Sequence, residues 1–195
     1  MKKIILTILE ESLRLTRSFI EDNADNIIKG ADMIATCISA GHKICLFGNG
    51  GSAADAQHLA AEFVNRFKIE RPPLAAIALI TDTSLLTSIA NDYHFDDIFS
   101  KQIEALAKKG DIAWGISTSG NSRNVVKATQ AAKSKELLTI GMTGRGGELA
   151  QWADLVFCAD SDDTARIQEA HITLGHILCE LVDRILYPDK FEEDS

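Results

Sequence analysis

The sequence predicts an α/β fold: a doubly wound parallel sheet of about five strands, preceded by helices and followed by a long buried helix. Two observations predict it. Short apolar runs alternate with helical patterns, and the runs are continuous, as is typical of parallel strands buried on both faces. Two glycine- and hydroxyl-rich stretches also follow apolar runs, at the carboxyl ends of strands where such folds bind ligands.

The first 40 residues predict one or two helices. Apolar side chains recur at helical spacing from about residue 4 to 38, with a break at Asn23-Ala24-Asp25. We interpret residues 1–195 as a single domain, because that length is enough for one core. Within it, residues 1–40 form a helical oligomerisation segment, residues 41–187 an α/β sandwich and residues 188–195 a tail.

Five apolar runs are the predicted strands, and helical patterns separate them. The runs are 44–47, 75–80, 112–116, 137–142 and 155–158. The intervening helices begin near Ser52, Thr83, Phe95, Asn121 and Gly147. Because crossovers between parallel strands usually contain a helix, we expect helices on both faces of the sheet.

The segment from Ala165 to Leu186 is apolar around much of a helix's circumference. Such a helix is normally buried on more than one side. The sheet covers one side only, so the leading helices or another subunit must cover the rest. We therefore predict a homo-oligomer.

Composition excludes several classes of partner. The formal charge is −8 and no Lys/Arg cluster occurs, which argues against direct binding to nucleic acid or an anionic membrane. The basic, apolar start of the chain ends at Glu10 and Glu11 with no cleavage site, so we expect a cytoplasmic protein.

The cysteines agree with that compartment. They are dispersed singly in apolar surroundings with no C-x-x-C pair, which predicts buried reduced thiols. They are Cys37, Cys45, Cys158 and Cys179.

The two glycine- and hydroxyl-rich stretches are candidate ligand loops. They are Phe47-Gly48-Asn49-Gly50-Gly51-Ser52 and Gly115-Ile116-Ser117-Thr118-Ser119-Gly120-Asn121-Ser122. Glycines let backbone N–H groups approach a phosphate, and the following helix directs its positive end toward it. Hydroxyls both donate and accept, which suits phosphate oxygens and sugar hydroxyls. The combination predicts a sugar phosphate.

His58 and Glu62 lie four residues apart in the helix that follows the first loop. Imidazole and carboxylate at that spacing can share a metal ion, although such pairs are more often solvated ion pairs. The pair would lie roughly 9 Å from the helix N-terminus, near the phosphate loop.

The terminal helix carries further candidate ligands. Gln168 and His176 are eight residues apart, about 12 Å of helix rise, so one ion would lie between them or symmetry-related helices would contribute. His171 is a competing ligand, or it forms a local hydrogen bond in the core. His42 and His94 are expected at the surface or in loops.

Five motifs in order resemble a known family. They are Gly48-Asn49-Gly50-Gly51-Ser52, His58 with Glu62, Asn91-Asp92, Ser117-Thr118-Ser119-Gly120-Asn121-Ser122, and Arg166-Ile167-Gln168-Glu169 with His176. Together they resemble the phosphoheptose isomerases of the sugar isomerase (SIS) domain superfamily, which has a flavodoxin-like fold. The resemblance runs from the leading helices to about Tyr187.

The resemblance implies interconversion of sedoheptulose 7-phosphate and D-glycero-D-manno-heptose 7-phosphate, for bacterial lipopolysaccharide or related glycans. It also implies a homotetramer with active sites at subunit interfaces and one zinc ion per subunit. The implied metal ligands are His58, Glu62, Gln168 and His176. The implied catalytic residues are Glu62 and His176. The implied substrate contacts are Asn49, Gly50, Gly51, Ser52, Glu62, Asn91, Asp92, Ser117, Thr118, Ser119, Ser122 and Gln168.

Other functions compete. The superfamily also contains regulatory proteins that bind the bacterial replication initiator DnaA. This chain resembles them at Gln57-His58, Asn65-Arg66-Phe67 and Glu70-Arg71-Pro72-Pro73-Leu74. That branch typically lacks the carboxylate and histidine found here as Glu62 and His176. Ala165 replaces an acidic residue of some isomerases, which leaves Asp162 or Asp163 as substitutes. A sugar-phosphate sensor without turnover, or an amino-sugar isomerase domain, is a third hypothesis.

Overall fold

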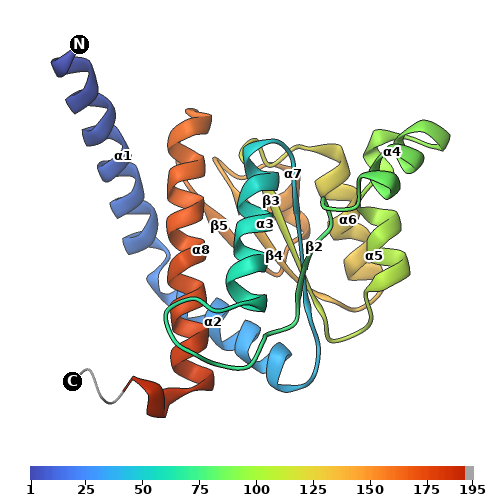
Figure 1. Ribbon diagram of the computed structural model, residues 1–195. Coiled ribbons are helices and arrows are strands. Elements are labelled where there is room, and N and C mark those ends of the chain that lie inside the picture. Colours follow the sequence, from blue (N-terminus) through green and yellow to red (C-terminus); the bar gives the residue numbers. More distant parts are fainter. Residues whose placement is uncertain (192–195) are drawn as a thin grey trace.

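The computed structural model describes residues 1–191 as a five-stranded parallel sheet between helical layers (Figure 1). The strands are β1 (Ile44–Gly48), β2 (Ala76–Ala78), β3 (Ile112–Ser117), β4 (Leu138–Thr143) and β5 (Leu155–Cys158), in the order β2-β1-β3-β4-β5. The predicted doubly wound fold and its five strands are confirmed. Residues 192–195 of the predicted tail lie outside the described residues.

Helices connect the strands as predicted, with one difference. They are α1 (Lys2–Asp22), α2 (Ala24–Ser39), α3 (Gly51–Val64), α4 (Thr83–Asp92), the 3₁₀ turn η1 (Phe95–Asp97), α5 (Ser100–Leu106), α6 (Arg123–Ser134), α7 (Glu148–Trp152), α8 (Thr164–Leu186) and the 3₁₀ turn η2 (Pro188–Lys190). The helix predicted to begin near Phe95 is instead a 3₁₀ turn followed by α5. Ile98 and Phe99 are both buried between these two elements, which redirects the chain there.

Each face of the sheet carries its own apolar core. Ile44 and Leu46 of β1 pack with α2, α3 and α8, whereas Cys45 and Phe47 pack on the other face with α5 and α6. Alternate side chains of one strand therefore enter different cores. This explains why the strands are continuous apolar runs rather than alternating ones.

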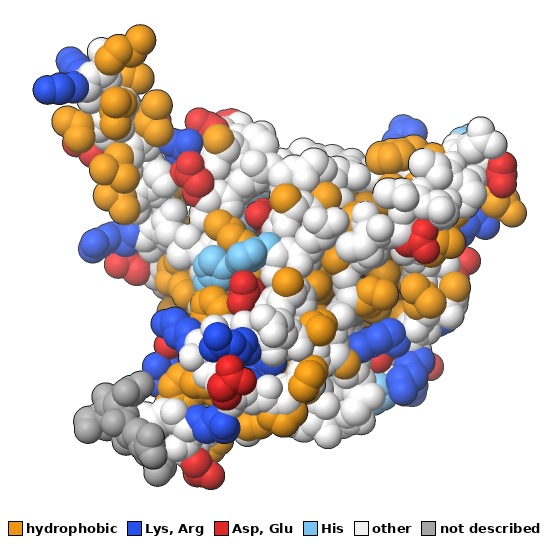
Figure 2. All heavy atoms as spheres, in the orientation of Figure 1, with side chains coloured by type: hydrophobic (Ala, Val, Ile, Leu, Met, Phe, Trp, Pro, Cys, Tyr) orange, Lys and Arg blue, Asp and Glu red, His pale blue; other side chains and the backbone are white. Residues whose placement is uncertain are grey.

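The terminal helix α8 contacts α1, α2 and α3, so the leading helices supply the cover predicted for it. The first helix α1 projects beyond the body (Figure 1), and Phe19 is its only buried residue. Its exposed apolar side chains form a stripe that Figure 2 shows along the projecting end. They are Ile4, Ile5, Leu6, Ile8, Leu9 and Leu13. Within residues 1–191, no helix combines the length and apolar character needed to cross a membrane.

The four cysteines are free thiols, but only three are buried. The prediction of a buried thiol at Cys158 is wrong, because this residue ends β5, the edge strand, where neighbouring elements cover it on one side only.

Candidate active site

The two glycine- and hydroxyl-rich loops meet at the centre of the sheet. β1 and β3 are neighbours, and the chain continues from β1 toward β2 and from β3 toward β4, in opposite directions. Loops at such a switch point leave a crevice between them. The Asn49 and Asn124 amides join the loops by donating to each other's oxygens, both at 2.8 Å.

Backbone conformation accounts for one glycine of the first loop and close packing for another. Gly50 has a positive φ of 56°, which side chains other than glycine rarely adopt. A Cβ on Gly51 would lie 2.3 Å from Nε2 of Gln168. The Gln168 amide of α8 therefore lies directly over the N-terminus of α3.

Hydroxyls of the second loop converge on one another. The Ser117 hydroxyl donates to Ser122 Oγ at 3.0 Å and lies 3.4 Å from Ser119 Oγ. Ser119 Oγ also accepts from the Asn121 N–H at 3.2 Å. These groups are only partly satisfied by one another, so they can exchange those contacts for a ligand's oxygens.

A cavity of about 250 Å³ lies between the two loops. It is lined by Asn49, Gly50, Gly51, Ser52, Ile116, Ser117, Thr118, Ser122, Thr164 and Gln168. None of these side chains is basic, so an anion here would be held by hydroxyls, amides and the N-terminal ends of α3 and α6. The cavity therefore gathers most of the predicted substrate contacts in one place.

A second cluster lies further along α3, where this helix runs beside α8. His58 Nε2 is 2.8 Å from His176 Nε2 and 3.5 Å from Glu62 Oε1. Figure 2 shows histidine side chains exposed on this face of the molecule. Phe67 stacks on His176, with ring centroids 5.4 Å apart and planes inclined by 24°.

The electrostatics of this cluster favour a neutral imidazole. Burial lowers the pKa of His176, His58 lowers it further, and Glu62 offsets only part of the effect. Burial also raises the pKa of Asp55, one turn before His58, to about 6. A neutral imidazole can accept a proton or bind a cation.

The donor set fits a divalent cation after a small adjustment. Within residues 1–191, no three His, Cys, Asp or Glu side chains are already placed to hold a metal ion. Tetrahedral zinc with ligands at 2.0–2.1 Å needs ligand atoms about 3.3 Å apart. The 2.8 Å and 3.5 Å separations of this cluster bracket that value, so side-chain rotations would suffice. Gln168 lies about two turns from His176, beside the cavity.

Some predicted residues lie elsewhere. Asn91 and Asp92, at the end of α4, are exposed and bonded to each other at 2.8 Å, and they do not line the loop cavity. Asp163 caps the N-terminus of α8 by accepting from the Ala165 N–H at 2.9 Å. Asp162 accepts from Arg145 at 2.5 Å. Both substitutes for an acid at position 165 thus already have partners.

The histidine alternatives are resolved. His171 is fully buried, with Nε2 3.0 Å from the Thr143 carbonyl oxygen, so it is a core residue and lies outside the cluster. His42 and His94 lie in loops, as expected. His42 Nδ1 also lies 3.5 Å from Asp111, a contact that the sequence did not indicate.

Three residues of the site were not predicted from the sequence. Thr164 lines the cavity, Asn124 joins the loops and Phe67 covers His176. One signal was available, for Asn124: it is a polar residue in the first turn of the helix that follows a ligand loop. Phe67 gave none, because its contact with α8 is distant in sequence.

Comparison with known proteins agrees with this geometry. A family model described as "SIS domain" matches residues 9–144. The fold and its paired loops are those of an SIS-domain protein. Phosphoheptose isomerase from Nitratidesulfovibrio vulgaris (strain Hildenborough) is 55% identical over 187 residues, which cover 95% of this chain and 90% of that protein. The chain belongs to the phosphoheptose isomerase family of enzymes.

Solved structures support the same assignment. The structure of phosphoheptose isomerase from Neisseria gonorrhoeae has a TM-score of 0.88 and 42% sequence identity, covering 93% of this chain and 98% of that one. A phosphoheptose isomerase from Francisella tularensis gives a TM-score of 0.90 at 35% identity, with 93% and 97% covered.

Proposed function

We propose that the protein interconverts sedoheptulose 7-phosphate and D-glycero-D-manno-heptose 7-phosphate. One observation carries the proposal: the loop cavity and the cluster of His58, Glu62 and His176 lie on the same pair of helices, α3 and α8. Gly51 and His58 are seven residues apart, about 10 Å of helix rise. That separation suits an open-chain sugar with its phosphate at one end and its carbonyl at the other.

The reaction moves one proton between adjacent carbons. Removal of a proton from C1 of the ketose and protonation of the C2 oxygen give an enediol. Delivery of a proton to C2 and loss of the proton from the C1 hydroxyl give the aldose. We assign Glu62 as the base at carbon and His176 as the partner that exchanges protons with oxygen.

The remaining residues bind and orient the substrate. The loop hydroxyls and the N-terminal ends of α3 and α6 hold the phosphate, so that its binding energy aligns the reacting carbons. His58, Glu62, Gln168 and His176 are the proposed ligands of one Zn²⁺ per subunit, which would polarise the substrate oxygens when bound.

We further propose a cytoplasmic homotetramer with active sites at its subunit interfaces, acting first in bacterial ADP-heptose and lipopolysaccharide core synthesis. The exposed apolar stripe of α1 and the 47% exposed His58 side chain support a site that a second subunit completes. Light scattering after gel filtration should give four times the 21.2 kDa chain mass. A monomer at micromolar concentration would contradict this assembly.

The geometry favours catalysis over the regulatory alternative. The relatives described above are named as isomerases. Phe67, part of the segment that resembles DnaA-binding proteins, here covers the His176 ring. Apart from the motifs shared with that branch, nothing in residues 1–191 supports binding to DnaA.

The deciding experiment follows sedoheptulose 7-phosphate by NMR with the purified protein. We expect aldose signals to appear, to stop after chelation and to return with zinc. Fructose 6-phosphate serves as the control for chain length. Absence of conversion by zinc-replete protein would exclude the proposed reaction, and full activity after exhaustive chelation would exclude the zinc role.

A further inference from the structure

We propose that Arg71, in the connection between α3 and β2, is a positioning residue that holds the carboxyl end of α3 against α8. By doing so it keeps Glu62 on α3 and His176 on α8 in register. This inference rests on the proposed function, because the register matters only if these two side chains act together.

The Arg71 guanidinium is almost fully enclosed, with 1% of the side chain exposed. Its Nη2 donates to the Glu62 carbonyl oxygen and its Nη1 to that of Phe63, both at 2.8 Å. The last four carbonyls of a helix have no partner within the helix. Arg71 therefore binds the backbone of the residue that carries the proposed base.

The same guanidinium also bonds to α8. Its Nε donates to Asp183 Oδ1 at 2.7 Å, and the Asp183 side chain is likewise 1% exposed. Asp183 lies seven residues, or about two turns, after His176. One planar group thus connects the two helices whose side chains form the cluster.

The connection continues along α8 as far as His176. Phe67 stacks on the His176 ring, and Lys68 forms an exposed ion pair with Glu180 at 2.5 Å. Residues 67–71 therefore follow α8 from His176 to Asp183. Among the contacts of residues 67–71, only that of Arg71 is buried, and it adds a polar contact at the end of α3 to the apolar packing of Leu59 on Gly175 between the two helices.

A helix cap alone does not require this arrangement. Water or a polar side chain could satisfy the α3 carbonyls. Burying Asp183 beside Arg71 also leaves one carboxylate oxygen, Oδ2, without a hydrogen-bond partner, which a cap does not require. A buried ion pair is often no more stabilising than apolar packing. The forked Arg71 guanidinium instead holds α3 and α8 at a fixed spacing. The single ammonium group of lysine would not reproduce that spacing.

The test compares Arg71→Gln with two controls. Lys68→Gln removes the exposed ion pair from the same connection. Lys43→Met leaves buried Asp111 without its 2.5 Å partner at the amino ends of β1 and β3, and so lowers stability through a contact that includes neither α3 nor α8. For each protein we would measure thermal unfolding, kcat and KM for sedoheptulose 7-phosphate, zinc affinity by chelator competition, and hydrogen exchange of the metal-free form.

We expect Arg71→Gln to lower kcat and zinc affinity about tenfold or more, with KM changed less than about threefold. Its amides at the end of α3 should exchange faster, while those of α6 do not. Lys68→Gln should match wild type. Lys43→Met should unfold at a lower temperature yet keep wild-type kcat and zinc affinity. Asp183→Asn, which keeps the carbonyl bonds of Arg71, should give a smaller effect and serves if Arg71→Gln does not fold.

Two outcomes would overturn the inference: wild-type kcat and zinc affinity in Arg71→Gln, or equal losses in Lys43→Met, which would reduce Arg71 to a stabilising residue. Failure of the proposed function is distinguishable, because wild-type protein would then neither isomerise the substrate nor bind zinc. In that case unchanged exchange at the end of α3 in Arg71→Gln would still contradict the positioning role.

Discussion

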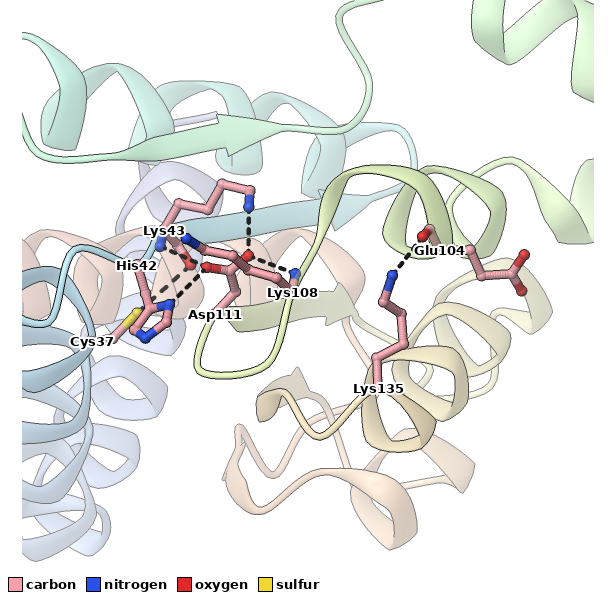
Figure 3. A network of polar contacts seen from close by, with 7 residues as sticks. All are labelled: Cys37, His42, Lys43, Glu104, Lys108, Asp111 and Lys135. Carbon is pink, nitrogen blue, oxygen red and sulfur yellow. Dashed lines mark hydrogen bonds and ion pairs between the residues drawn. The ribbon is translucent and has the colours of Figure 1, made fainter.

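The polar groups at the two ends of the sheet differ in how completely they are hydrogen-bonded. At the amino ends of the strands, the fully buried Asp111 carboxylate accepts from Lys43 Nζ at 2.5 Å and from the N–H groups of Lys43 and Lys108 at 3.0 and 2.9 Å (Figure 3). Figure 3 shows His42 beside the same carboxylate. Every oxygen of this group is satisfied by the chain itself.

At the carboxyl ends, polar groups are clustered but incompletely paired. The loop hydroxyls lie around an open cavity at these ends, and halfway along α3 and α8 the His58 and His176 nitrogens face each other, with Glu62 3.5 Å from His58. Satisfied polar groups stabilise a fold, whereas unsatisfied ones near a cavity are available to a ligand. Substitutions in the Asp111 network should therefore change stability, and those at the loop cavity or in the cluster of His58, Glu62 and His176 should change turnover.

The largest expected effect is in the cluster of His58, Glu62 and His176. Glu62→Gln removes the proposed base while keeping its size, so kcat should fall roughly 10²–10⁴-fold. KM and the unfolding temperature should stay close to wild type, because the amide still fits the cluster. Steady-state kinetics and calorimetry measure both. Near-wild-type turnover in this variant would exclude Glu62 as the base.

The second effect is at the amino end. Asp111→Ala leaves the Lys43 ammonium and two N–H groups without their acceptor and should lower the free energy of unfolding by about 3–5 kcal/mol. For a chain of this length, that is a fall of about 10 °C in unfolding temperature. The kcat at 25 °C should be unchanged. Lys109→Ala, which removes an exposed pair with Glu136, is the control and should cost less than about 1 kcal/mol.

The third effect is a pH dependence that separates two buried titratable groups, His171 and Asp111. Burial lowers the pKa of His171 to about 4, and its bond to the Thr143 carbonyl offsets little of this. Because the folded pKa is below the unfolded value of about 6.5, unfolding takes up a proton between those values. Stability is therefore complete above pH 6.5 and falls by on the order of 3 kcal/mol toward pH 4.

The Asp111 contribution to acid unfolding should begin at lower pH. Burial raises its pKa, but the hydrogen bonds from Lys43 and the Lys108 N–H more than offset burial, so the pKa lies below its usual value. The stability it contributes is present above about pH 3.9 and is lost as pH falls through the folded pKa. His171→Gln should flatten urea-derived stability between pH 6.5 and 4 only. An unchanged slope there would contradict the assignment.

Local patterns were enough to predict most of the fold. The strands, the break near Asn23 and the ligand loops all follow from apolar periodicity and glycine placement within short windows. The turn from Phe95 to Asp97 was missed because it depends on Ile98 and Phe99 entering the core, which is a tertiary effect. Cys158 was missed because an edge strand cannot be recognised before the strand order is known.

The site was predictable in its parts but not in its arrangement. Helical spacing placed His58 beside Glu62, and loop composition predicted an anion. The spacing of Gln168 and His176 did not decide whether both bind the same ion. The crossing of α3 and α8 determines which side chains meet, and the sequence does not give that crossing. The contact between Arg71 and Asp183 gave no signal, because the two residues are 112 positions apart and a buried charged pair has no sequence pattern.

The smallest expected effect concerns which cysteine thiols react without opening of the fold. Burial raises the pKa of Cys37 to about 11 and of Cys45 to about 12, and it also raises that of Cys179. Since the thiolate is the reactive form, these three thiols should be modified only when the chain opens, whereas exposed Cys158 reacts at once. Mass spectrometry after brief alkylation at pH 8 should therefore find one modified cysteine per chain.

Cys158→Ser should abolish this fast reaction and change the free energy of unfolding by less than about 0.5 kcal/mol. Rapid modification of Cys45 as well would show that the sheet itself opens, and would remove the contrast between a rigid amino end and an accessible carboxyl end.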